Sequence, residues 1–119
     1  MLAIRDAQVA AFAGDGFRRW MEAHLMEFFP ERCRAMGPRA VAAAVQAGRD
    51  AAAAHGLADD DDVRRYIDVT FALGDGSDDF PWVGEILADP ALGAPSYRVH
   101  TLEQAALEYL RQRAEGPRV

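Results

Sequence analysis

The sequence predicts an all-α fold, a compact irregular bundle of five to six helices. Apolar residues recur at steps of three and four over most of the chain, which is the period of a helix buried on one face. No alternating apolar and polar stretch is long enough to indicate a strand, and glycine and proline separate the helical stretches. With 119 residues of which 50% are hydrophobic, the chain is expected to form one domain, 1–119, in which 116–119 are a frayed tail.

The first half of the chain contains three helical stretches and a short additional piece, 30–36, that is not counted among the five to six helices. An alanine-rich stretch, 4–13, ends before a glycine-rich break, and the short piece begins at a proline. Between them a helix follows Asp15 as its N-cap, with an apolar face formed by Phe17, Trp20, Met21, His24, Leu25 and Phe28. The third stretch runs from Pro38 to His55 before Gly56, its expected C-terminal cap, and its small-residue face consists of Val41, Ala44, Val45, Gly48 and Ala52.

The second half contains three more stretches. The aspartates 59–62 are expected to cap a helix that ends near Gly74 and is the most buried of the domain. Its apolar face, widened by Val69 and Leu73, comprises Val63, Tyr66, Ile67, Thr70 and Phe71. A short helix is expected from Pro81 to about Asp89. The last helix is expected to start at Thr101 as N-cap, after a locally extended segment, 97–100.

Charge and composition exclude several classes of partner. The formal net charge is -6 and basic residues form no run, so nucleic acids and anionic membranes are not expected partners. The chain has no signal-like start and no apolar run of the roughly 20 residues that cross a bilayer. Its single cysteine excludes an intramolecular disulfide, which favours a cytoplasmic location.

An acidic turn, 75–79, is the strongest candidate for a metal site. Its weak candidate ligands are Asp75, Asp78 and Asp79, with Glu85 or His100 as further ones. Counted from Asp75, the sixth and twelfth positions hold Phe80 and Ile86, where an EF-hand requires glycine and glutamate. The preferred interpretation is that Asp78 or Asp79 caps the helix that begins at Pro81.

No set of residues predicts catalysis. Cys33 lies between arginines that lower a thiol pKa, but no histidine is near it in sequence, so an ordinary thiol is the preferred interpretation. The three histidines, His24, His55 and His100, lie on different segments, without the four-residue spacing of a helical zinc site. The sequence therefore predicts a protein that is not an enzyme, with no catalytic residue and no cofactor.

Aromatic side chains exceed what a small bundle can hide. The neighbours Phe28 and Phe29 point about 100° apart on a helix, so one of them is expected to be exposed. Exposed aromatic side chains are typical of protein-binding surfaces. The candidate partner-binding residues are Phe28, Phe29 and Trp82.

The layout of the chain also resembles a known group of proteins. The motifs concerned are Ile4-Arg5-Asp6-Ala7-Gln8, the helix closing with Phe29-Pro30, His55-Gly56-Leu57, Asp62-Val63-Arg64-Arg65-Tyr66, Leu73-Gly74, the segment from Pro81 to Asp89, and the final helix from Leu102 to Leu110. They resemble small all-helical accessory proteins of bacterial type VI secretion and polymorphic-toxin gene clusters. The resemblance implies an adaptor or chaperone-like partner of a larger secreted protein or toxin, and it transfers no site residue.

Together these observations predict a non-enzymatic protein–protein interaction domain. Two alternatives remain open at this point. One is a small metal- or ligand-binding domain that uses the acidic turn, 75–79, and the other is a self-associating structural module.

Overall fold

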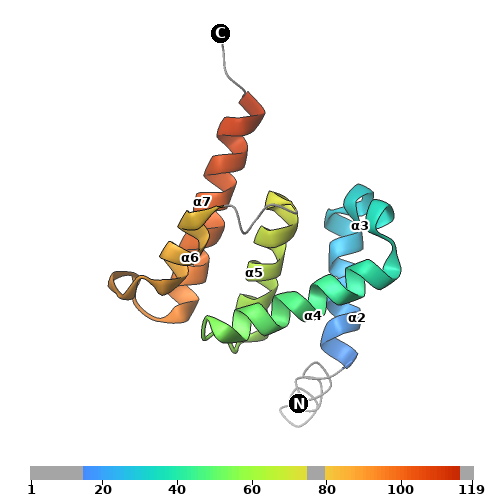
Figure 1. The fold of residues 1–119 in the computed structure, drawn as a ribbon, viewed down its shortest axis with the longest axis horizontal. Coiled ribbons are helices and arrows are strands. Elements are labelled where there is room, and N and C mark those ends of the chain that lie inside the picture. The colour runs from blue at the N-terminus through green and yellow to red at the C-terminus, as the bar shows by residue number, and fades with distance from the viewer. Residues whose placement is uncertain (1–14, 75–79, 116–119) are drawn as a thin grey trace, which may run out of the picture. The chain divides into compact units, whose positions relative to one another are not determined.

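The computed structural model describes residues 15–74 and 80–115 (Figure 1). Within these residues it contains six α-helices, one short 3-10 helix and no strand, which confirms the all-α prediction. The elements are α2 (Asp15–Phe28), α3 (Pro30–Met36), α4 (Pro38–Ala54), α5 (Asp60–Leu73), α6 (Pro81–Ala88), η2 (Pro90–Leu92) and α7 (Pro95–Glu115). The predicted helix over 4–13, the acidic turn over 75–79 and the predicted tail over 116–119 lie outside the described residues.

The chain divides into two units, 1–50 and 51–119, and each is described by itself. The boundary falls inside α4, whose residues 38–50 belong to the first unit and 51–54 to the second. The backbone of α4 is nevertheless helical without interruption from Pro38 to Ala54. The single domain expected from the sequence stays a prediction.

The first unit is built on the buried side of α2. Phe17, Met21 and Leu25 are almost completely buried and follow one another at four-residue steps. The guanidinium of Arg49, on α4, lies 4.9 Å from the ring centroid of Phe17. The face predicted for this helix was too wide, because Trp20 and Phe28 are exposed.

Phe29 joins α2 to α3 through its backbone. Its N–H donates to the Leu25 carbonyl at 2.7 Å, and its carbonyl accepts from the Cys33 N–H at 3.0 Å. Pro30 then occupies the first turn of α3, where no N–H donor is needed. The short piece predicted over 30–36 is confirmed as a helix with these bounds.

The end of α4 confirms the predicted glycine cap. Gly56 has a φ of 82°, in the left-handed region that favours glycine. The Gly56 N–H donates to the Ala53 carbonyl at 3.0 Å and the Leu57 N–H to the Ala52 carbonyl at 2.9 Å. The helix ends at Ala54, one residue before the predicted end.

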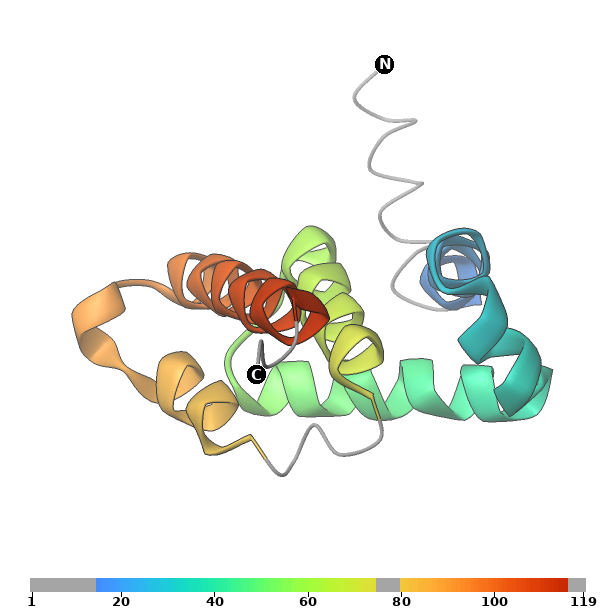
Figure 2. The same cartoon turned by 90° about the horizontal axis from the view of Figure 1, so that it is seen from above.

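In the second unit, α5 and α6 both pack against α7 (Figures 1 and 2). Among the described helices α5 buries the most side chains, as predicted, including Ile67, Val69 and Leu73. Asp59 is its N-cap, and the Asp59 carboxylate accepts a hydrogen bond from the Asp61 N–H at 2.9 Å. The predicted capping role of the aspartate run is therefore confirmed at its first member.

The start of α7 differs from the prediction. The helix begins at Pro95, so Thr101 lies inside it and residues 97–100 are helical, not extended. Proline at the first turn of a helix is favourable, and here it starts a helix that the sequence analysis placed after it. Arg98 helps to fix this start, because its Nε donates to the Gly93 carbonyl at 2.7 Å.

The N-cap of α6 also differs from the prediction. Phe80 occupies this position and provides no side-chain cap, whereas Asp78 or Asp79 was expected to cap the helix. Those two aspartates lie outside the described residues. The helix begins at Pro81, as predicted, and ends at Ala88.

Candidate interaction surface

Five large apolar side chains are exposed in the described part of the chain, and three of them are on α2. They are Trp20, Met26 and Phe28, which are 41%, 62% and 61% exposed. Large apolar side chains gathered on one short helix are typical of a contact surface. The outer side of α2 is therefore the candidate functional site.

An aromatic ladder runs along one edge of this side of α2. We use this name for Trp20, His24 and Phe28, which follow one another at four-residue steps. The Trp20 and His24 rings are stacked at a centroid distance of 5.8 Å, and the His24 and Phe28 rings lie 4.8 Å apart. Buried Phe17 supports the ladder, with its ring 5.9 Å from that of Trp20. These contacts order the rings before any partner binds.

A second strip, here called the Ala23 strip, lies beside the ladder on the side of α2 that faces away from the core. Its members are Arg19, Ala23, Met26 and Glu27, and all four are exposed. Arg18 and Glu22, by contrast, form an ion pair along the helix at 3.4 Å. Among the described residues, the side chains of Arg19 and Glu27 form no ion pair or hydrogen bond.

The residues predicted to bind a partner have different surroundings. Phe28 is exposed, whereas Phe29 and Trp82 are half-buried. The Trp82 ring belongs to an aromatic cluster in the second unit, where it lies 5.6 Å from the ring of Phe80 and 5.9 Å from that of Tyr109. Only Phe28 therefore presents a mostly free aromatic face.

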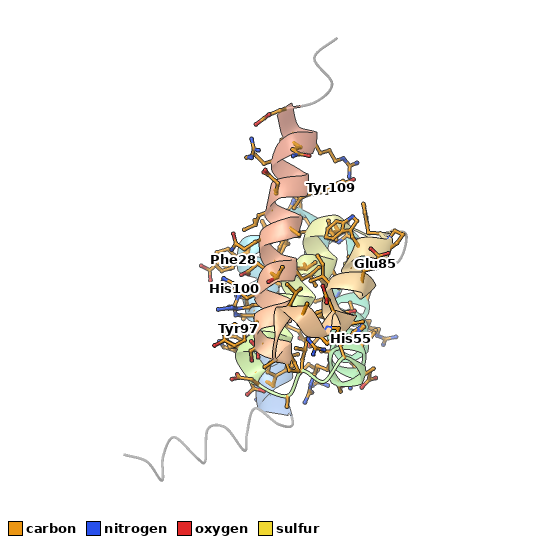
Figure 3. All side chains as sticks on the ribbon, turned by 90° about the vertical axis from the view of Figure 1, so that its left-hand side faces the viewer. Phe28, His55, Glu85, Tyr97, His100 and Tyr109 are labelled. Atoms are coloured by element: carbon orange, nitrogen blue, oxygen red, sulfur yellow. The ribbon has the colours of Figure 1, made fainter. Side chains whose placement is uncertain are left out.

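The remaining exposed apolar residues are on α7. Tyr97 and Leu107 are 68% and 56% exposed, and Tyr97, His100 and Tyr109 follow one another along the helix (Figure 3). His100 and Gln104 are also exposed and lie between Tyr97 and Leu107 in the sequence. Polar residues thus separate the two apolar side chains, so this surface is less apolar than that of α2.

Acidic residues of α5 form ion pairs and a hydrogen bond with other side chains of the protein. Asp61 pairs with Arg64 at 2.9 Å and with Arg65 at 3.1 Å, and Asp68 pairs with Arg64 at 2.9 Å. Burial favours a lower pKa for Arg64, but its hydrogen bonds and the charges of Asp61 and Asp68 raise its pKa overall. Buried Asp62 accepts a hydrogen bond from the Ser96 hydroxyl, which joins the starts of α5 and α7.

The candidate metal ligands are not brought together in the described residues. Asp75, Asp78 and Asp79 lie outside them, and Glu85 and His100 are exposed on α6 and α7. No group of three or more histidine, cysteine, aspartate or glutamate side chains is placed to hold a metal ion in the part of the chain that the structure describes.

Cys33 is a buried thiol whose environment corrects one expectation. Burial raises the pKa of Cys33, and this effect outweighs the lowering by the charge of Arg32. The flanking arginines alone predict a lowered pKa. A raised pKa reduces the fraction of thiolate, so the environment does not activate Cys33 as a nucleophile.

The sequence did not identify Trp20 and Met26 as surface residues. In the structure, the buried stripe of α2 is formed by Phe17, Met21 and Leu25. Trp20 lies about 100° from Met21 around the helix and Met26 about 100° from Leu25, so neither shares the centre of that stripe.

No protein-family model, curated protein or solved structure matches the chain. Among the described helices, none is both long and apolar enough to cross a membrane.

Proposed function

We propose that the protein is a non-enzymatic interaction domain and that the aromatic ladder of α2 is its binding surface for another protein. One observation carries this proposal: Trp20 and Phe28 are exposed at the two ends of an ordered row of rings. Aromatic side chains contribute a large contact area at a low cost in conformational entropy, which makes them frequent hot spots.

The net charge of the chain supports a protein partner. The formal net charge of the chain is -6, which disfavours nucleic acids and anionic lipid surfaces. The resemblance to accessory proteins of type VI secretion and polymorphic-toxin clusters favours a larger secreted protein or toxin as this partner. In that setting the domain acts as an adaptor or chaperone-like subunit and performs no chemistry.

Affinity capture with matched variants tests the proposal. The tagged protein is recovered from the lysate of its own organism in three forms, namely the wild type, Phe28→Ser and Leu107→Ser. Leu107 is the control, because its exposed fraction is similar to that of Phe28 but it lies on α7. The wild type and Leu107→Ser are expected to retain one stoichiometric protein that Phe28→Ser loses.

The captured protein is then purified and its affinity is measured by calorimetry. Loss of a hot-spot aromatic ring is expected to weaken binding by about tenfold or more. Recovery of no partner with the folded wild type, or equal affinity for the wild type and Phe28→Ser, would contradict the proposal.

A further inference from the structure

The Ala23 strip shares no residue with the aromatic ladder beside it and contains two opposite charges that α2 does not pair. Ala23 lies two residues from both Met21 and Leu25, so its side chain points about 160° away from these buried side chains. Arg19 and Glu27 stand four residues before and after it. Arg19 and Glu27 are therefore equally distant from Ala23 and opposite in charge.

Among the described side chains of α2, neither charge has a partner: Glu22, three residues after Arg19, pairs with Arg18, and Glu27 has no arginine three or four residues away. Oppositely charged side chains pair along a helix at spacings of three or four, as Arg18 and Glu22 do. Four residues after Arg19, and four before Glu27, the chain has the small apolar Ala23. Arg19 and Glu27 themselves are eight residues apart, about 12 Å along the axis, which is too far for a direct ion pair.

We propose that the Ala23 strip is a dimer interface, in which α2 packs antiparallel against α2 of a second copy about a two-fold axis at Ala23. Residues equally distant from Ala23 then lie at the same level of the pair. Arg19 of each copy meets Glu27 of the other, so both unpaired charges become paired. Trp20 and Met26 lie three residues before and after Ala23. Trp20 of one copy therefore lies at the same level as Met26 of the other, where the indole and the thioether can make contact.

Charge selects this arrangement over a parallel one. A parallel pair would place Arg19 beside Arg19 and Glu27 beside Glu27, and like charges in contact are strongly unfavourable. In the antiparallel pair every such contact is between opposite charges. Ala23 has no side chain beyond Cβ, so the two backbones can approach closely where the helices cross.

The interface is small, so the dimer is expected to be weak. One 14-residue helix from each copy forms the contact, and such an interface is smaller than the roughly 1,200 Å² buried in the smallest stable complexes. We therefore expect a dissociation constant in the micromolar range or above, with monomer and dimer in rapid exchange.

The dimer has a consequence for the aromatic ladder. Trp20, His24 and Phe28 all lie on one side of the Ala23 strip, at about 60°, 100° and 140° around the helix from Ala23. The two-fold axis then places the ladders of both copies on the same side of the pair. This consequence, unlike the pairing, rests on the proposed function, because it assigns the ladders of both copies to one larger partner surface.

Charge reversal in purified protein tests the pairing directly. Sedimentation equilibrium over a concentration series up to several hundred micromolar gives the dissociation constant of the wild type, Arg19→Glu, Glu27→Arg and the double variant. Each single reversal places like charges together twice and is expected to weaken the dimer by about tenfold or more. The double variant restores opposite charges and is expected to recover the affinity of the wild type.

Two controls separate pairing from general effects of charge. Arg113→Glu also reverses the charge of an exposed arginine, but on α7, and it is expected to leave the dissociation constant of the dimer unchanged. The variant Ala23→Cys places thiols beside the two-fold axis, and mild oxidation is expected to cross-link it as a disulfide dimer. Wild-type protein, whose only cysteine is buried Cys33, is expected to stay uncross-linked.

Three results would overturn the dimer: a wild type that remains monomeric throughout the series, single reversals that dimerise as well as the wild type, or a double variant without recovery. None of them bears on the aromatic ladder, which Phe28→Ser tests by capture of another protein. Conversely, loss of capture without any change in self-association leaves the dimer intact, so the two proposals fail separately.

Discussion

At the scale of single residues, the hydrogen bond between Asp62 and Ser96 joins two helices that are distant in sequence. Asp62 is the buried charged residue of the described core, and a buried carboxylate that loses its donor pays a desolvation cost. We expect Ser96→Ala to lower the free energy of unfolding by about 1–2 kcal/mol, measured by urea denaturation.

A double-mutant cycle provides the control for this prediction. Once Asp62→Ala has removed the acceptor, Ser96→Ala is expected to have little further effect, since the two residues act through one bond. If the two losses are instead additive, the hydrogen bond does not contribute to stability and the prediction is wrong.

The thiol of Cys33 gives a second prediction at this scale. Burial raises its pKa above the ordinary value of 9.0, so less thiolate is present at pH 8 than in an unfolded chain. Alkylation of the folded protein by iodoacetamide is expected to be at least about tenfold slower than in urea. The rate in the folded protein is expected to go on rising with pH beyond the point at which the rate in urea levels off, because the folded-state pKa is the higher one. Equal rates in the folded and unfolded protein would indicate an accessible, unperturbed thiol.

At the scale of helices, sequence patterns identified buried faces better than helix starts. The face of α5 and the glycine that ends α4 were predicted correctly, because periodic apolar residues and a left-handed glycine are local signals. The start of α7 was missed because Thr101 was expected to be its N-cap, after an extended segment, 97–100, whereas the helix begins at Pro95. Val99 and Leu102, both fully buried, are three residues apart and already carry the helical period back across the segment predicted to be extended.

The candidate surface was predictable only in part, for a related reason. Adjacency of Phe28 and Phe29 correctly indicated that one of them is exposed. The ladder was hidden, because Trp20, His24 and Phe28 follow the same four-residue step as the buried stripe beside them. A repeat spacing identifies residues that share a face, but which of two neighbouring stripes is covered depends on tertiary packing.

The N-cap of α5 provides a prediction for a whole element. Asp59 accepts a hydrogen bond from the Asp61 N–H, and its charge lies at the positive end of the helix. Asp59→Ala is expected to cost about 1 kcal/mol of unfolding free energy, whereas Asp59→Asn keeps the acceptor and is expected to cost much less. Urea denaturation of the three proteins measures the difference. Equal losses for both variants would show that the side-chain cap does not stabilise the helix.

At the scale of the whole molecule, α4 connects the two units. Its hydrogen-bonded backbone continues across the boundary at Asp50, so neither unit can unfold completely without breaking this helix. The second unit, 51–119, is also small for independent stability, and the first, 1–50, is smaller still. Both considerations favour cooperative unfolding of the chain, as expected for one domain.

The two tryptophans allow a direct test, because Trp20 belongs to the first unit and Trp82 to the second. Trp82→Phe leaves Trp20 as the only indole reporter, and Trp20→Phe leaves Trp82. Urea unfolding of each variant is followed by fluorescence and by far-ultraviolet circular dichroism, at a protein concentration low enough to keep the chain monomeric. We expect the fluorescence and dichroism midpoints to coincide within each variant, since the core around α2 and the core around α5 are lost together.

Comparison within one variant removes any effect of the substitution on overall stability. A fluorescence midpoint that differs from the dichroism midpoint by more than about 0.5 M urea in either variant would show that the units unfold separately, and the chain would then contain two domains joined by a shared helix.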